Sequence, residues 1–119
     1  MSFQSELQDI CREMAGCRAA FVMSLDGISI AQEKRDPALD LETLLIELGA
    51  PLRQAIAALQ AVEAGALTEA VFATEKGVLL VRWLREEYFV AMFCDPDAIL
   101  GRARYVLRRH AGALLKELS

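Results

Sequence analysis

Few residues of this 119-residue chain have the type and spacing that catalysis requires. His110 is the only histidine and the obvious candidate for a general base near neutral pH. Its position in an apolar helical pattern favours a structural role instead. Asp95 and Asp97 could hold a metal ion, but turn formation explains Asp95 and helix capping explains Asp97. We therefore expect neither a metal site nor a catalytic histidine.

The motifs that bind phosphate groups or activate nucleophiles are missing from the sequence. A phosphate-binding loop needs G-x-x-x-x-G-K-[ST] or G-x-G-x-x-G, and a nucleophile elbow or a zinc-binding helix needs G-x-S-x-G or H-E-x-x-H. None of these patterns occurs in the chain. We therefore expect a protein that is not an enzyme and that uses no cofactor.

The cysteines and the apolar runs indicate a cellular compartment. Cys11, Cys17 and Cys94 are an odd number without the spacing of a zinc site, which is typical of buried, reduced thiols in a cytosolic protein. Charged residues interrupt the first twenty positions, so we expect no signal peptide. No apolar run approaches the roughly 20 residues that span a bilayer. We expect a cytoplasmic protein without membrane insertion.

The net charge of −4 argues against a general affinity for nucleic acid. Residues 98–119 nevertheless carry five basic side chains and one acidic side chain. A basic last helix could meet phosphate groups, although a solvated outer face explains the same pattern. The apolar content of 55% indicates a folded core, and the length predicts one domain over residues 1–119.

Apolar periodicity and turn signals predict the element order α-β-β-α-β-β-β-α. Ser2 is a suitable cap for the first helix, and Asp26-Gly27 between two apolar runs predicts a hairpin. Asp40 precedes a long helical pattern over about 40–64. The remaining elements are predicted strands at 68–74, 78–84 and 88–94 and a last helix over 98–118, with Asp97 as its N-cap.

The apolar strands predict the layers of the fold. Because several strands are continuously apolar rather than alternating, the sheet should be covered on both faces. We expect an α/β (α+β) fold with a five-stranded, mainly antiparallel sheet sandwiched between helices. The short segments 28–31 and 70–75 should be its edges. Pro51 predicts either a kink in the middle helix or two abutting helices.

The middle helix carries a second stripe besides its core stripe. The predicted core stripe is Leu41, Leu45, Leu48, Leu52, Ala55, Leu59 and Val62. The opposite stripe is Thr43, Ile46, Ala50, Gln54, Ala57, Ala61 and Ala64, with Arg53 at its margin. Small residues let another backbone approach closely, although alanine could simply favour the helix. We expect an isologous contact between two copies of the chain.

Three segments together resemble a known family. They are AAFVMSLDGISIA after the first helix, LRQAIAALQ in the middle helix, and DPDAILGRARYVLRR at the last helix. With the predicted element order, the chain resembles the roadblock (dynein light-chain-like) family, and within it the bacterial MglB-like proteins of gliding motility. The resemblance extends from about Phe3 to Leu118.

The resemblance implies partners and surfaces. Roadblock domains form homodimers or heterodimers that join their middle helices and a neighbouring edge strand, and they commonly bind Ras-like small GTPases across the paired helices. By position, the dimer interface would comprise Ala50, Ala57, Ala61, Ala64, Val71 and Ala73. The GTPase-binding surface would comprise Thr43, Ile46, Glu47, Arg53 and Gln54.

The mechanism and two other functions stay open at this point. A stimulator of GTP hydrolysis can insert an arginine, for which Arg53 is the candidate, but positioning of the GTPase's own switch loops needs no such residue and is what we expect. Small-molecule sensing would require an apolar cavity near Phe21, Trp83, Phe89 and Phe93. The chain could also be a structural subunit that pairs with a different roadblock-type chain.

Overall fold

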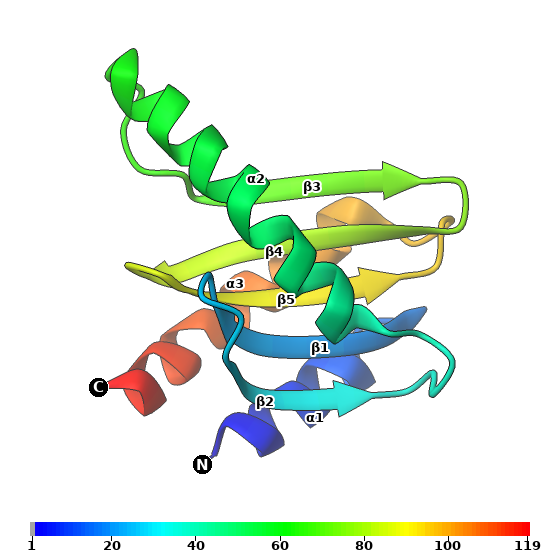
Figure 1. Cartoon of the computed structure of the whole chain (residues 1–119). Coiled ribbons are helices and arrows are strands. Elements are labelled where there is room, and N and C mark those ends of the chain that lie inside the picture. The colour runs from blue at the N-terminus through cyan, green and yellow to red at the C-terminus, as the bar shows by residue number, and fades with distance from the viewer. Residues whose placement is uncertain (1) are drawn as a thin grey trace.

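The computed structural model describes residues 2–119 and has the predicted order of elements (Figure 1). Its helices are α1 (Phe3–Glu13), α2 (Leu41–Ala61) and α3 (Leu100–Leu118). Its strands are β1 (Cys17–Ser24), β2 (Ser29–Lys34), β3 (Glu69–Thr74), β4 (Gly77–Arg85) and β5 (Tyr88–Cys94).

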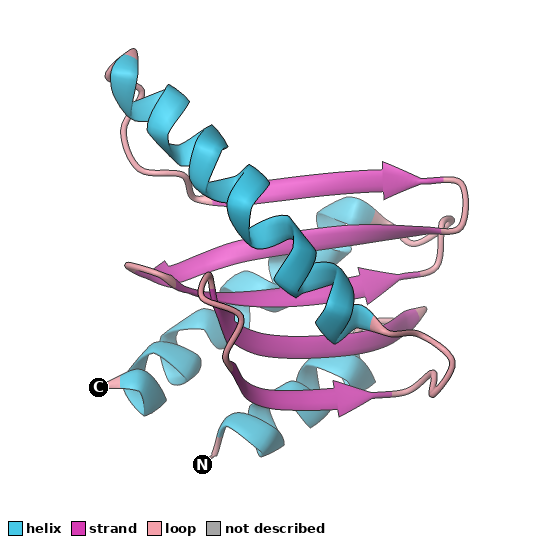
Figure 2. Cartoon of the chain, in the orientation of Figure 1, coloured by secondary structure: helices cyan, strands magenta, loops and turns pink. Residues whose placement is uncertain are grey.

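The strands form one antiparallel sheet in the order β2-β1-β5-β4-β3. Strands β2 and β3 have a neighbour on one side only, so they are the edges that the short apolar segments predicted. Helices α1 and α3 lie behind the sheet in Figure 2, and α2 crosses its front. The predicted three-layer fold is therefore confirmed.

Each face of the sheet has its own apolar core. Successive side chains of a strand point to opposite faces. Ala20 and Val22 of β1 accordingly pack on the side of α1 and α3, whereas Phe21 and Met23 pack on the side of α2. Because both faces are covered, the central strands need apolar residues at every position, which explains their lack of alternation.

The helix starts follow the predicted caps in two cases out of three. The Ser2 hydroxyl accepts a hydrogen bond from the Ser5 amide, and the Asp40 carboxylate accepts one from the Thr43 amide. The prediction for the last helix is wrong, because α3 begins at Leu100 with Ile99 at the N-cap position and no side-chain cap. Asp97 lies before that position, in the turn that follows β5. No described helix is both long enough and apolar enough to cross a membrane.

Pro51 does not divide the middle helix. Helix α2 is continuous from Leu41 to Ala61, so the prediction of two abutting helices is wrong. Proline removes one amide donor, which leaves the carbonyl of Glu47 without its usual partner. Both residues lie on the exposed side of the helix, where water can take the place of that amide.

Most of the aromatic residues that a sensing cavity would need are packed in the core. Phe21, Phe89 and Phe93 are at most 8% exposed and belong to the apolar cluster under α2. Trp83 contacts Phe89 with ring centroids 5.7 Å apart. The three phenylalanine rings fill the layer between sheet and helix, whereas Trp83 is half-buried, so the four aromatic residues do not enclose a cavity in the core.

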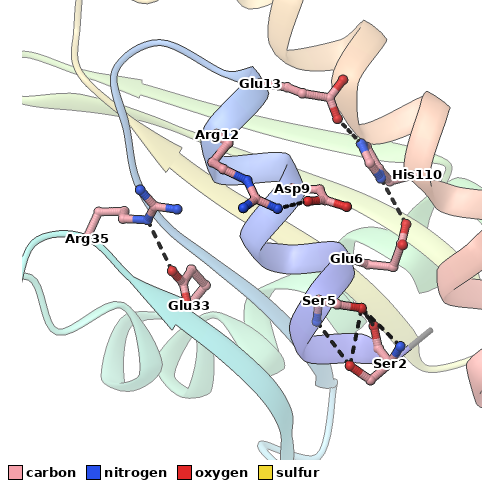
Figure 3. A network of polar contacts seen from close by, with 9 residues as sticks. All are labelled: Ser2, Ser5, Glu6, Asp9, Arg12, Glu13, Glu33, Arg35 and His110. Atoms are coloured by element: carbon pink, nitrogen blue, oxygen red, sulfur yellow. Dashed lines mark hydrogen bonds and ion pairs between the residues drawn. The ribbon is translucent and has the colours of Figure 1, made fainter.

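A buried histidine joins α1 to α3 (Figure 3). His110 Nδ1 lies 2.9 Å from Oε1 of Glu6, and Nε2 contacts the carboxylate of Glu13, which Arg109 also contacts at 3.2 Å. Both ring nitrogens face acceptors, and a neutral imidazole has only one N–H to donate. Burial lowers the pKa of His110, but the two hydrogen-bonded carboxylates outweigh it, and the pKa is raised.

The raised pKa gives the histidine a defined effect on stability. Its contribution is complete below the ordinary histidine pKa of about 6.5 and is lost as pH rises through the raised value. We expect His110→Gln to lower the free energy of unfolding by about 2 kcal/mol at pH 6 and by less at pH 9. Urea unfolding of both proteins across this range measures the difference. A difference that is constant or grows with pH would contradict the assignment.

Candidate functional site

Helix α2 is only partly covered by its own sheet. Its fully buried residues, Leu41, Leu45, Gly49 and Leu52, all lie in its first twelve positions. The following segment, residues 53–61, extends past β3 in Figure 1, and we refer to it as the overhang. The predicted core stripe is therefore wrong beyond Leu52, because Ala55 is exposed, Leu59 is half-buried, and Val62 is 73% exposed.

A close backbone contact fixes where α2 sits on the sheet. A Cβ atom at Gly49 would lie 2.8 Å from the carbonyl oxygen of Leu25 in the β1–β2 hairpin, closer than real Cβ atoms come. Glycine is therefore required where the helix passes over this hairpin. Ile46 contacts the same hairpin, since its side chain lies 3.4 Å from the Cβ position of Gly27.

Arg53 joins the start of the overhang to two turns of the sheet. Its Nη2 donates to Asp26 of the β1–β2 turn at 2.6 Å, and its Nη1 donates to Glu87 of the β4–β5 turn at 3.0 Å. The Glu87 carboxylate raises the pKa of Arg53, with a smaller effect from Asp26. The guanidinium is thus engaged within its own chain, and insertion into a partner would require both ion pairs to break.

The edge strand β3 offers unpaired backbone groups beside the overhang. Its other side pairs with β4 over residues 69–74. Val71 packs on the side of α1 and α3, while Ala70 packs on the side of α2. By the same alternation Ala73 shares the face of Val71, and Phe72, 36% exposed, shares the face of α2.

Two grooves run along the base of the overhang. One of about 440 Å³ lies between the overhang, the α2–β3 loop and the end of β4, and its lining includes Ile56, Gln60, Leu67 and Trp83. Another of about 260 Å³ lies on the hairpin side and is lined by Leu25, Arg53, Ile56, Ala57, Gln60, Glu86 and Glu87. The side of the overhang that faces the sheet therefore borders two grooves, and its opposite side is exposed to solvent.

Solved structures share the fold of this chain, although no protein-family model and no curated protein sequence matches it. MglC from Myxococcus xanthus is 30% identical, with 98% of this chain and 99% of that chain covered and a TM-score of 0.69. The chain belongs to the roadblock/LC7 family. The gliding protein MglB from Thermus thermophilus is 22% identical, with 95% and 85% covered and a TM-score of 0.83.

A roadblock/LC7 domain from Streptomyces avermitilis shares the fold at a low sequence identity. It is 13% identical, yet 99% of this chain and 98% of that chain superpose with a TM-score of 0.86. The resemblance inferred from three segments of sequence is therefore confirmed at the level of the fold.

The structure brings most of the predicted site residues of this roadblock domain onto one side. Thr43, Ile46, Glu47, Ala50, Arg53, Gln54, Ala57 and Ala61 are all exposed on α2. Val71 and Ala73 lie on the edge strand β3 but face the side of α1 and α3, so the structure does not bring their side chains together with those on α2. The placement of Ala64 on the helix is wrong, because α2 ends at Ala61 and Glu63 adopts a positive φ of 57°, which turns the chain away.

Several exposed apolar residues of this surface were absent from the predicted site. The predicted core stripe includes Val62, and the predicted dimer interface names Val71 and Ala73 of β3 but not Phe72. Ile56 and Leu59 lie on the half-buried underside of the overhang. Helical periodicity places Leu59 and Val62 on the core side of α2. They are not in the core because the sheet does not extend beneath them, and the sequence does not reveal the width of the sheet.

The contact at Gly49 can be tested with a matched pair of glycine substitutions. Gly49→Ala should lower the free energy of unfolding by about 1–3 kcal/mol, because the added methyl group meets the Leu25 carbonyl. Gly112→Ala in α3 should raise it by about 0.5–1 kcal/mol, because nothing lies within 4 Å of its Cβ position. Chemical denaturation of both variants gives the comparison. Equal effects at the two positions would show that α2 does not touch the hairpin backbone.

Proposed function

We propose that this roadblock domain is a homodimeric adaptor and that the side of α2 formed by Ala50, Ala57 and Ala61, together with the β3 edge, forms its dimer contact. The observation that carries the proposal is the overhang itself. Its underside contributes Ile56 and Leu59, its end contributes the exposed Val62, and its upper side carries Ala57 and Ala61. A helical segment with apolar residues on both sides lacks half of its packing partners.

The β3 edge supports the same contact from a different direction. Two copies related by a twofold axis place the same strand beside itself in antiparallel orientation, so the free backbone groups of β3 can pair. Phe72 would then face the α2 layer of the joined sheet, below the two overhangs. The small side chains of Ala57 and Ala61 permit close approach of the two helices.

A second part of the proposal is the partner of the dimer. The exposed surface around Thr43, Ile46, Glu47, Arg53 and Gln54 would bind a Ras-like small GTPase. Support comes from membership of the roadblock family and from the position of this surface beside the proposed dimer contact. Regulation would proceed by positioning the GTPase's switch loops, since Arg53 is already paired with Asp26 and Glu87.

The dimer contact predicts a specific loss of self-association. Ala57→Glu should turn the dimer into a monomer at micromolar concentration, because it places a charge in the contact. Ala57 is exposed in the single chain, so the fold should survive the change. Ala38→Glu, at an exposed position in the β2–α2 loop, is the matched control and should remain dimeric.

Sedimentation with circular dichroism measures both mass and fold. A wild-type chain that sediments as a monomer at these concentrations would remove the homodimer. Exchange with a second roadblock-type chain upon mixing would instead assign the same surface to a heterodimer.

The proposed GTPase partner predicts nucleotide-dependent binding and only a small effect on GTP hydrolysis when Arg53 is substituted. A Ras-like GTPase should be retained by the domain in only one of its nucleotide states. Arg53→Ala should change stimulated hydrolysis at saturating domain by less than about tenfold, because an inserted arginine is worth about 10³-fold or more. Arg108→Ala, an exposed arginine on α3, is the control. A loss of about 10³-fold with unchanged binding would show that Arg53 is inserted.

A further inference from the structure

All three cysteines of the chain meet at one corner of the fold. Cys11 lies near the end of α1, Cys17 begins β1, and Cys94 ends β5 as the direct strand partner of Cys17. The Sγ atoms of Cys11 and Cys17 are 3.2 Å apart. Cys17 is half-buried, whereas Cys11 and Cys94 are 6% and 3% exposed.

The surroundings of Cys11 favour its thiolate. Contact with the Cys17 thiol lowers the pKa of Cys11, and burial opposes this effect. The charge of Arg35 lowers the pKa further, and the charge of Glu33 acts against it. The same contact between the two thiols raises the pKa of Cys17. A thiolate with an adjacent thiol is the arrangement from which disulfides form most readily.

We propose that Cys11 and Cys17 are a redox modification site that a hydroperoxide converts into a reversible disulfide. The Cys11 thiolate attacks one peroxide oxygen, the O–O bond breaks, and a sulfenic acid forms while hydroxide leaves and is protonated to water. Cys17 then attacks Sγ of Cys11, the S–S bond forms, and the S–O bond breaks with release of a second water. Two thiols are oxidised and one hydrogen peroxide is reduced to two waters.

The geometry selects Cys11–Cys17 over the pairs that involve Cys94. Cys94 is the competing partner, because it also raises the pKa of the Cys17 thiol, although its effect is smaller than that of Cys11. The Cys11 sulfur lies 3.2 Å from that of Cys17, and Cys11 is the more exposed of the two competitors. No group of three or more His, Cys, Asp or Glu among residues 2–119 has an arrangement that could hold a metal ion. Oxidation therefore fits the corner better than metal binding.

The disulfide would tie the end of α1 to the start of β1 through the short α1–β1 loop. Beside that loop lies Glu13, which contacts His110, and within it lies Gly16, which has a positive φ of 86°. The loop also forms one wall of a groove of about 380 Å³, opposite Asp95, Ile99 and Arg102. Oxidation would thus stiffen a groove on the opposite side of the sheet from α2.

The test is stoichiometric oxidation of the full chain by hydrogen peroxide, followed by intact mass and non-reducing peptide mapping. We expect a mass loss of about 2 Da, a peptide linked through Cys11 and Cys17, and full reversal by dithiothreitol. A gain of oxygen atoms without a mass loss, a link through Cys94, or a disulfide between two chains would overturn the proposal.

Variants separate the roles of the three sulfurs. Cys17→Ser should abolish the mass loss and leave Cys11 as a trappable sulfenic acid, while Cys94→Ser should retain the mass loss. If a serine unfolds this corner, Cys17→Ala and Cys94→Ala give the same comparison. A mass loss that persists without Cys17 would assign the disulfide to another pair.

Discussion

The sheet of this domain is apolar on both faces, and the structure follows from the need to cover them. Phe21 and Met23 on one side and Ala20 and Val22 on the other are fully buried within a single strand. The burial of a large apolar side chain is worth about 1.5–3 kcal/mol, so neither face can be left to water. Two helices cover one face, and a single helix covers the other.

The two coverings are held in different ways. On the face that α1 and α3 cover, the buried His110 of α3 contacts two carboxylates of α1. These contacts join the helices from the two ends of the chain. On the other face, α2 is set by the backbone contact at Gly49 and by the two ion pairs of Arg53. The first arrangement is internal and buried, whereas the second lies at the surface, where a bound protein can reach it.

Much of the fold was predictable because local chemistry determines it. The Asp26-Gly27 turn, the caps Ser2 and Asp40, and the unalternating strands each specify a local structure that the tertiary contacts keep. Asp97 was misassigned because capping propensity favours a polar residue at a helix start, whereas α3 begins after the apolar Ile99 without any side-chain cap. The sulfur cluster could not be predicted, because Cys94 reaches Cys17 only through the pairing of β1 with β5.

The overhang was missed for a geometric reason. Periodicity shows which side of α2 is apolar but not how far the sheet extends beneath it. A helix of 21 residues is about 31 Å long, whereas five strands at about 4.8 Å spacing span roughly 19 Å. Helix α2 is therefore longer than the sheet is wide, and its last turns extend past β3 (Figure 1).

The free edge of β3 affects how the protein is handled by chaperones and proteases in the cell. A newly made copy presents unpaired backbone next to Phe72 and an exposed Val62 at the end of α2, which are the features that chaperones bind and that promote strand-to-strand aggregation. If a partner covers this edge, its supply decides how long each copy stays exposed to chaperones and proteases. The abundance of the domain would then follow the concentration of its partner as well as its own rate of synthesis.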